Sequence, residues 1–163
     1  GTATFAYELA LQRDWNPPDA VVMPLGHGTL FLGTYRGFRS LVDAGWIDSM
    51  PRLLGAQAAG YAPIASELHP AADGENTVAD GIQIRAPTRK RQLLDAIAET
   101  NGDAIAVGED AVRTELDRLH ANGFYVEPTC AIAPAALAAY RERGTLGPNA
   151  DVVVPLTGHG LKG

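Results

Sequence analysis

The sequence predicts an α/β domain, in which a mostly parallel sheet of about four strands carries helices on both faces. Short apolar runs alternate with longer segments whose apolar residues recur every three or four positions. The short runs are rich in Val and Leu without polar alternation, which is typical of parallel strands buried on both faces. Gly and Pro, at 18 and 11 of 163 residues, indicate many short loops between these segments.

Four strands are expected, at Val21–Met23, Arg52–Ala56, Ala104–Val107 and Val152–Leu156. Residues 57–60 either end the second strand or open a short helix. The polar stretch Ala71–Asn76 is typical of a loop, and Tyr125–Val126 of a short extended piece.

Helices are expected between the strands, at Thr2–Arg13, Thr29–Ala44, Thr88–Asn101, Glu109–Asn122 and Pro134–Arg143. Asn16-Pro17-Pro18 stops the first, and Gly123 closes the fourth. Thr88 is a candidate N-cap for the third, because its hydroxyl can accept from a free backbone N–H.

Composition limits the function classes. Hydrophobic residues make up 46% and charged residues 20%, which is typical of one soluble globular domain over residues 1–163. The net charge of −6 argues against a nucleic-acid partner. The longest run without a formal charge, Ala20–Tyr35, holds a Pro and three Gly, so it does not predict a membrane span. The single cysteine, Cys130, forms no internal disulfide, which favours a reducing, cytoplasmic location.

The start of the chain runs directly into a helical pattern at Phe5, Ala6, Leu9 and Ala10, without a Met or a basic segment. We therefore expect a cut end rather than a natural terminus.

A glycine-rich turn, Gly26–Leu30, lies between the first strand and the helix that follows it. Glycines at such a turn let backbone N–H groups approach an anion, and the helix N-terminus adds partial positive charge. No Gly-Lys-Ser/Thr follows, so this is not a Walker loop, and the spacing to Gly33 is wrong for a dinucleotide fingerprint. A phosphate site and a tight packing turn both remain open on spacing alone.

The last strand repeats this arrangement, because it too leads into a Gly-His-Gly turn, Gly158–Gly160. If both strands are parallel, the two turns share one edge of the sheet and can line one pocket. The alternative is that buried parallel strands are commonly Val-rich and need Gly at their exits.

Other candidate sites are weaker. His27, His159 and Cys130 lack metal-ligand spacing, so no metal site is expected. The basic run Arg89–Arg91 is interpreted as a solvated helix start rather than a nucleic-acid patch. Glu109 and Asp110 favour a structural role at a helix N-terminus.

Six motifs occur in one order along the chain: Gly1–Glu8, Val22–Leu30, Pro51–Ala58, Thr77–Ile82, Gly123–Ala131 and Leu156–Lys162. Together they resemble the fold-type II pyridoxal-phosphate enzymes, the tryptophan synthase β-like family. The last motif, Leu-Thr-Gly-His-Gly-Leu-Lys, is most similar to the threonine synthases within that family.

The resemblance implies pyridoxal 5'-phosphate as cofactor, acting as an electron sink for a carbanion. It places the cofactor phosphate on five residues, Gly26, His27, Gly28, Thr29 and Leu30. It also places the Thr157 hydroxyl at the pyridine nitrogen, Ala79 and Gly81 beside the ring, and Glu127 and Cys130 near its face or edge. A neutral hydroxyl does not hold a proton on that nitrogen as an aspartate would, which favours elimination or replacement over transamination.

The family's Schiff-base lysine lies in a Ser-x-Lys-[DN] segment, and these 163 residues contain no such segment. The Ser/Thr-x-Gly-Asn loop that holds the substrate carboxylate has no match either. His27 stands where the family usually has Asn or Gly. We therefore expect the C-terminal portion of a larger enzyme, with no catalytic residue of its own. Its expected partners are the N-terminal part of the same enzyme and a small amino-acid substrate, and a homodimer is compatible with the resemblance.

The sequence leaves three kinds of function open. The first is part of a threonine synthase-like lyase, which converts O-phosphohomoserine and water to threonine and phosphate. Cysteate synthase and threonine or serine dehydratase are its enzymatic alternatives. The second is a non-catalytic α/β module that binds a phosphate ester through Gly26–Leu30, and the third is a plain interaction domain.

Overall fold

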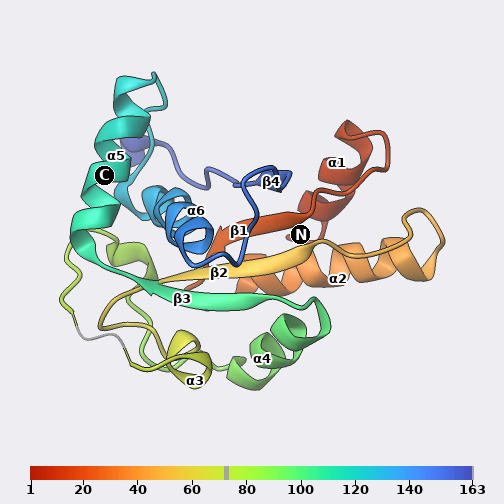
Figure 1. The fold of residues 1–163 in the computed structure, drawn as a ribbon, viewed down its shortest axis with the longest axis horizontal. Coiled ribbons are helices and arrows are strands. Elements are labelled where there is room, and N and C mark those ends of the chain that lie inside the picture. Colours follow the sequence, from red (N-terminus) through yellow and green to blue (C-terminus); the bar gives the residue numbers. More distant parts are fainter. Residues whose placement is uncertain (72–73, 163) are drawn as a thin grey trace.

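The computed structural model describes residues 1–71 and 74–162 as a parallel sheet between two layers of helices (Figure 1). The strands are β1 (Ala20–Pro24), β2 (Arg52–Ala58), β3 (Asp103–Val107) and β4 (Val152–Val153), and their order in the sheet is β3-β2-β1-β4. All three strand pairs are parallel, so the predicted fold class is confirmed.

The helices are α1 (Thr4–Gln12), α2 (Thr29–Asp43), α3 (Ala65–Leu68), α4 (Lys90–Glu99), α5 (Glu109–Ala121) and α6 (Ile132–Glu142). The described residues also form three 3₁₀ turns, η1 (Asp80–Ile82), η2 (Pro128–Ala131) and η3 (Gly160–Lys162). Five of these six α-helices were expected from the sequence; the four-residue α3 is too short to show a period.

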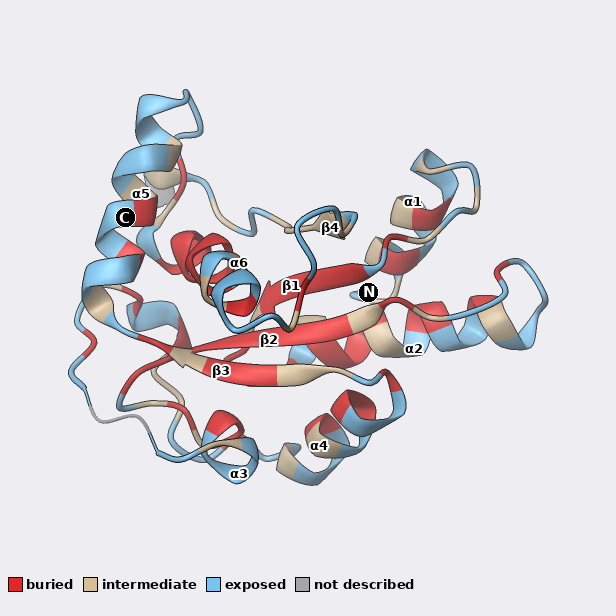
Figure 2. Cartoon of the chain, in the orientation of Figure 1, coloured by how far each residue is buried: buried red, intermediate tan, exposed pale blue. Residues whose placement is uncertain are grey.

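Both faces of the sheet are buried (Figure 2). Val21 and Met23 of β1 pack on the face covered by α1, α2 and α4, against Phe31 and Leu93 among others. Ala20 and Val22 point to the opposite face, where α6 and α5 supply a second core. Alternate residues of one strand therefore enter two different cores, which explains why β1 is apolar throughout.

Tyr140 of α6 ties this second layer to the central strand. Its side chain is fully buried, and its hydroxyl donates to the carbonyl oxygen of Gly55 in β2 at 2.8 Å. Burial raises the pKa of the Tyr140 hydroxyl far above its usual range, so it stays a donor.

Two strand ends differ from the expected ones by more than one residue. β4 stops at Val153, and the expected continuation to Leu156 lies outside the ladder. Pro155 cannot donate a ladder hydrogen bond, and β4 is an edge strand with only β1 beside it. β2 runs through Ala58 instead of breaking at residue 57, and its last residues pair with Val107 and Ala106 of β3.

The expected Thr88 cap was also wrong. Helix α4 begins at Lys90, with Arg89 in the N-cap position and no side-chain capping bond. The chain instead turns through a hydrogen bond from the Lys90 N–H to the Pro87 carbonyl oxygen at 3.1 Å. Helix α6 begins at Ile132, two residues before the expected start, because Pro134 falls in the first turn, where no N–H is needed.

Two of the minor expectations concern loops. Residues 72 and 73 of the expected loop Ala71–Asn76 lie outside the described residues, and the described remainder contains no helix or strand. The expected extended piece at Tyr125–Val126 is confirmed, because Val126 forms an antiparallel bridge with His159.

No helix in the described part of the chain combines the length and the apolar character that a membrane crossing requires.

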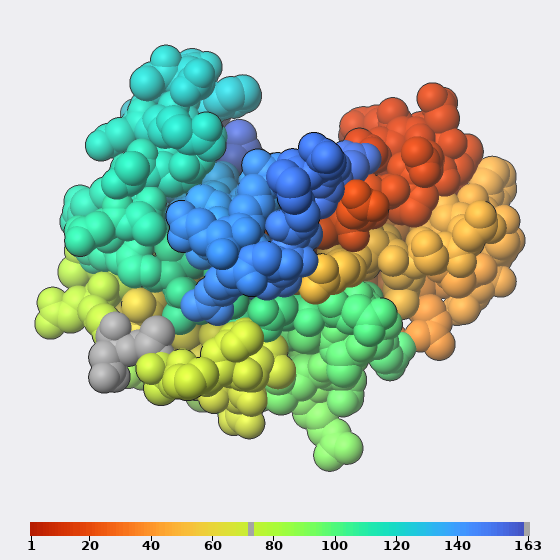
Figure 3. Space-filling model, in the orientation of Figure 1, coloured from red at the N-terminus to blue at the C-terminus, as the bar shows by residue number. Residues whose placement is uncertain are grey.

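The sheet has a switch in its winding between β1 and β4. After β1 the chain passes through α2 on one face to reach β2, whereas α6 on the other face leads to β4, on the opposite side of β1. In open α/β sheets, ligands bind beyond the carboxyl ends of the strands at such a point. The space-filling view shows α6 and the residues that follow it, in shades of blue, lying between α5 and the N-terminal helix (Figure 3).

Candidate cofactor site

The loop Gly26–Leu30 lies at this switch point, between the carboxyl end of β1 and the start of α2. Within the described residues, no backbone N–H from Gly26 to Leu30 donates to a protein acceptor. The first helical hydrogen bond runs from the Leu32 N–H to the Gly28 carbonyl oxygen at 2.9 Å. The loop therefore presents free donors and the positive end of the α2 dipole together, which is the arrangement that binds a phosphate.

Gly28 is required at its position for two reasons. Its φ of 81° lies in the left-handed region, and a Cβ there would come within 2.5 Å of the Leu93 side chain. Gly26 is also closely packed, since its Cβ would lie 3.1 Å from Ile82. The loop is thus bounded on its protein side by α4 and η1. This close packing holds the backbone that carries the free N–H donors, and such donors are the groups from which a phosphate accepts hydrogen bonds.

The other loop residues differ in exposure. His27 and Thr29 are exposed, and Leu30 is half-buried. The Thr2 hydroxyl donates to the Thr29 carbonyl oxygen at 3.1 Å, which ties the start of the chain to the first turn of α2. The His27 side chain makes no hydrogen bond to another described residue, so its ring is free to contact a ligand.

Thr157 follows β4 and is exposed beside a cavity of about 240 Å³ that Leu156, Gly158 and His159 also line. The hydroxyl oxygen of Thr157 lies 3.5 Å from the sulfur of Cys130. Because β1 and β4 are parallel neighbours, Thr157 and the Gly26–Leu30 loop leave the same edge of the sheet.

Cys130 is fully buried behind this cavity. Its sulfur accepts the Gly158 N–H and lies 3.2 Å from the Gly158 carbonyl oxygen. The Glu127 N–H donates to the same carbonyl oxygen at 3.2 Å, and the half-buried Glu127 side chain packs against Gly158. These contacts fix the backbone on which Thr157 is carried.

Ala79 and Gly81 lie on the segment from Thr77 to Ile82, which packs against the Gly26–Leu30 loop and against η2. Ala79 is buried, and the Asn76 side chain both accepts its N–H and donates to its carbonyl oxygen, at 3.1 and 3.0 Å. Gly81 is exposed, and a Cβ on it would lie 3.0 Å from the Thr129 hydroxyl. Contacts thus run from Gly26 to η1 and from Gly81 to η2.

Glu109 holds this segment against α5. Its carboxylate accepts the Thr77 N–H at 2.6 Å and two guanidinium N–H groups of Arg113, at 2.6 and 3.0 Å. The Thr77 N–H and then Arg113 lower the pKa of the Glu109 carboxyl below its ordinary 4.5. The structural role expected for Glu109 is therefore a tie between the start of α5 and the segment that carries Ala79 and Gly81.

This tie predicts a pH effect. A carboxyl whose pKa is lowered by folding stabilises the protein above its unfolded pKa, and the stabilisation is lost as the pH falls through the folded value. Glu109→Gln should therefore make the free energy of unfolding less dependent on pH below about pH 4.5. Near pH 7, the dependence of this free energy on pH should change little. Thermal unfolding of both proteins between pH 3 and 7 measures this. Curves that stay parallel over that range would contradict the role given to Glu109.

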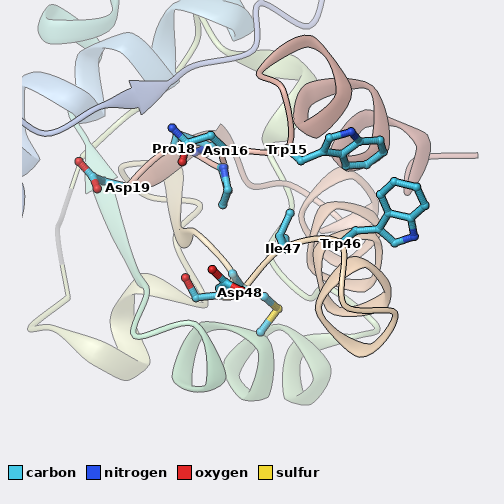
Figure 4. A pocket seen from close by; sticks show the side chains of 10 residues that line it. Trp15, Asn16, Pro18, Asp19, Trp46, Ile47 and Asp48 are labelled. Atoms are coloured by element: carbon cyan, nitrogen blue, oxygen red, sulfur yellow. The ribbon is translucent and has the colours of Figure 1, made fainter.

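A second cavity, of about 350 Å³, lies at the opposite edge of the sheet (Figure 4). It is lined by the segments before β1 and β2, residues 15–19 and 46–50. The rings of Trp15 and Trp46 pack on each other with centroids 4.5 Å apart, and Asp19 points away from them. This cavity lies at the amino ends of the strands, whereas the free donors of Gly26–Leu30 lie at the carboxyl end of β1.

Nothing in the described residues brings three His, Cys, Asp or Glu side chains together as a metal site. His27 follows β1 and His159 follows β4, while Cys130 bonds Gly158.

Sequence reasoning missed the residues that support the site from behind, Gln57, Ile82 and Leu93. Gln57 carried a signal, because it is the one polar residue between Leu53 and Ala58 in β2. Ile82 and Leu93 carried none, since their contacts with Gly26 and Gly28 join segments more than 50 residues apart.

A glycine loop between strand and helix, at the switch point of a parallel sheet, is typical of α/β proteins that bind phosphate-bearing ligands at the carboxyl edge of the sheet. Comparison with known sequences identifies the family within this class. The family model for pyridoxal-phosphate dependent enzymes matches residues 1–158, and the chain belongs to that family.

Curated relatives match along nearly the whole chain. Threonine synthase of Methanosarcina acetivorans is 34% identical over 169 residues, which cover 99% of this chain and 42% of that protein. Threonine synthase of Methanocaldococcus jannaschii is 34% identical over 171 residues, with the same coverage of both chains. The chain thus spans less than half the length of these relatives.

Solved structures share the fold. The processed form of threonine deaminase isoform 2 from Solanum lycopersicum superimposes with a TM-score of 0.73 at 22% identity, over 98% of this chain and 42% of that one. Maize serine racemase gives a TM-score of 0.71 at 20% identity, over 98% and 47%. At these identities the likeness supports the fold alone.

Proposed function

We propose that the chain is the C-terminal, cofactor-phosphate-binding part of a threonine synthase, which converts O-phosphohomoserine and water to threonine and phosphate. The observation that carries the proposal is the row of free N–H donors from Gly26 to Leu30 at the switch point. The match to threonine synthases over 99% of the chain supports the choice of this reaction.

The residues of the chain have separate roles in this proposal. The Gly26–Leu30 amides and the Thr29 hydroxyl bind the cofactor phosphate, and the exposed His27 ring adds a contact beside them. The Thr157 hydroxyl faces the pyridine nitrogen, held in place by Cys130 and Gly158. Pyridoxal phosphate supplies the electron sink that stabilises charge at the substrate's α-carbon. The segment that carries Ala79 and Gly81 lies beside the ring in this proposal, and Glu127 and Cys130 lie behind the Thr157 segment.

The test of the reaction uses the full-length enzyme that carries these 163 residues. With pyridoxal phosphate bound, it should release one phosphate and form one threonine from each O-phosphohomoserine. Release of ammonia from threonine or serine, without phosphate release from O-phosphohomoserine, would identify a dehydratase instead. Consumption of sulfite with phosphoserine would identify a cysteate synthase.

We also propose that the lysine which binds the cofactor covalently lies in the part of the enzyme outside these residues. The chain has two lysines, Lys90 and Lys162. Lys90 pairs with Glu67 at 2.5 Å and is 42% exposed, so its amine is held in a surface ion pair rather than beside the proposed cofactor site. Borohydride reduction of the full-length holoenzyme, followed by peptide mapping, should label a lysine elsewhere. Label on Lys90 or Lys162 would show that these residues contain the complete catalytic apparatus.

A further inference from the structure

Gln57 is a fully buried amide at the carboxyl end of β2, directly beside the end of β1. Its Nε2 donates to the carbonyl oxygen of Leu25 at 3.1 Å. Its Oε1 accepts the N–H groups of Ile64 and Ala65 at the start of α3, at 2.9 and 3.0 Å. The side chain therefore joins the end of β1 to the segment that follows β2.

Leu25 is the residue immediately before the Gly26–Leu30 loop, and β2 holds it by three different groups. Its N–H donates to the Ala56 carbonyl oxygen at 2.8 Å, and its carbonyl oxygen accepts from Gln57. Its buried side chain packs against Gly55, where a Cβ would lie 2.7 Å from it. Of these three contacts, the bond to Gln57 is the one nearest the peptide that begins the loop.

We propose that Gln57 is a positioning residue for the cofactor phosphate: it orients the peptide between Leu25 and Gly26 and thereby aims the loop's N–H groups. The inference rests on the proposed role of Gly26–Leu30 as the phosphate loop. Gly26 is packed against Ile82 and Gly28 against Leu93, so the loop has apolar contacts at two points and this polar one at its entrance. A hydrogen bond weakens steeply when the angle at its hydrogen falls below about 120°, whereas apolar packing has no such directional dependence.

Gln57→Met in the full-length enzyme keeps the length of the side chain and removes its polar atoms. The measurement is the ratio of two dissociation constants of the apoenzyme, for pyridoxal and for pyridoxal 5'-phosphate, by absorbance titration. The ratio isolates the contribution of the phosphate group. We expect the ratio of the pyridoxal constant to the pyridoxal 5'-phosphate constant to fall about tenfold, which corresponds to the loss of one hydrogen bond between the misaligned loop and the phosphate.

Tyr140→Phe is the matched control. It removes a different buried hydrogen bond to β2, the one to the Gly55 carbonyl oxygen, without touching Leu25. Its ratio should equal that of the wild type, even if its stability is lower. Equal weakening of both ligands by Gln57→Met would show a structural role only and overturn the inference.

A second variant serves if Gln57→Met does not fold. Gln57→Glu keeps an acceptor for Ile64 and Ala65, and its carboxyl donates to Leu25 only when protonated. Its phosphate preference, relative to wild type, should therefore fall as the pH rises; a preference equal to wild type at every pH overturns the inference. A wild-type enzyme that binds pyridoxal as tightly as pyridoxal 5'-phosphate would instead overturn the proposed loop, and this inference with it.

Discussion

Gly28→Ala is expected to abolish most of the cofactor affinity and to lower the free energy of unfolding by about 3 kcal/mol. A non-glycine residue in the left-handed region costs about 1–2 kcal/mol, and the new Cβ meets Leu93 at 2.5 Å. Relief of that overlap moves Leu93 or the loop, and a loop that moves no longer directs its N–H groups at one point. Urea unfolding and titration with pyridoxal phosphate, both on the full-length enzyme, measure the two effects.

Gly45→Ala is the control for the backbone contribution. Gly45 also has a left-handed φ, 72°, but no atom of the described residues lies within 4 Å of the position its Cβ would take. This variant should lose about 1 kcal/mol of stability and keep the wild-type affinity for the cofactor. Equal effects of the two substitutions on cofactor affinity would mean that the packing of Gly28 on Leu93 does not shape a phosphate site.

Thr157→Asp is expected to change the visible absorbance of the bound cofactor and to lower turnover by about tenfold or more. A carboxylate at the pyridine nitrogen favours its protonated form, raising the pKa of that nitrogen by about 1–3 units. The reaction proposed here uses a neutral ring, for which the Thr157 hydroxyl is the suitable neighbour. Thr157 is exposed beside its cavity, so the new charge is not buried and the fold should tolerate it.

Thr157→Ser is the control that keeps the hydroxyl group and adds no charge. It retains a hydroxyl within reach of Cys130 and should leave both the absorbance maximum and the turnover near wild type. If the aspartate variant keeps the wild-type spectrum and rate, Thr157 does not face the cofactor ring. Reduced turnover with an unchanged spectrum would place its effect elsewhere in the reaction.

Much of the sheet could be predicted from the sequence, because β1 and β2 are buried on both faces and their apolar runs stand out. The same holds for the Gly26–Leu30 loop, since a turn between strand and helix at a parallel sheet needs glycine. The end of β4 could not be predicted from Val content. Val152–Val154 is uniformly apolar, but the edge position and Pro155 decide where pairing stops.

The support of the site depends on contacts that no local pattern encodes. Gln57 lies 32 residues from Leu25, and its partner atoms are backbone groups that any residue carries. Cys130 contacts Gly158 across 28 residues, so its part in holding the Thr157 segment is visible only in the structure. The prediction of a Thr88 cap was wrong for a similar reason. The Lys90 N–H donates to the Pro87 carbonyl oxygen, so it needs no hydroxyl as acceptor.

The proposed function depends above all on one contact, between the backbone N–H groups of Gly26–Leu30 and the cofactor phosphate. Hydrogen–deuterium exchange of the full-length enzyme, with and without pyridoxal 5'-phosphate, observes these groups directly. We expect slower exchange in peptides that contain residues 26–30 when the cofactor is present, and little change in residues 15–19 and 46–50 around the opposite cavity. Cofactor-dependent protection at that opposite edge, with unchanged exchange at residues 26–30, would contradict the proposed contact.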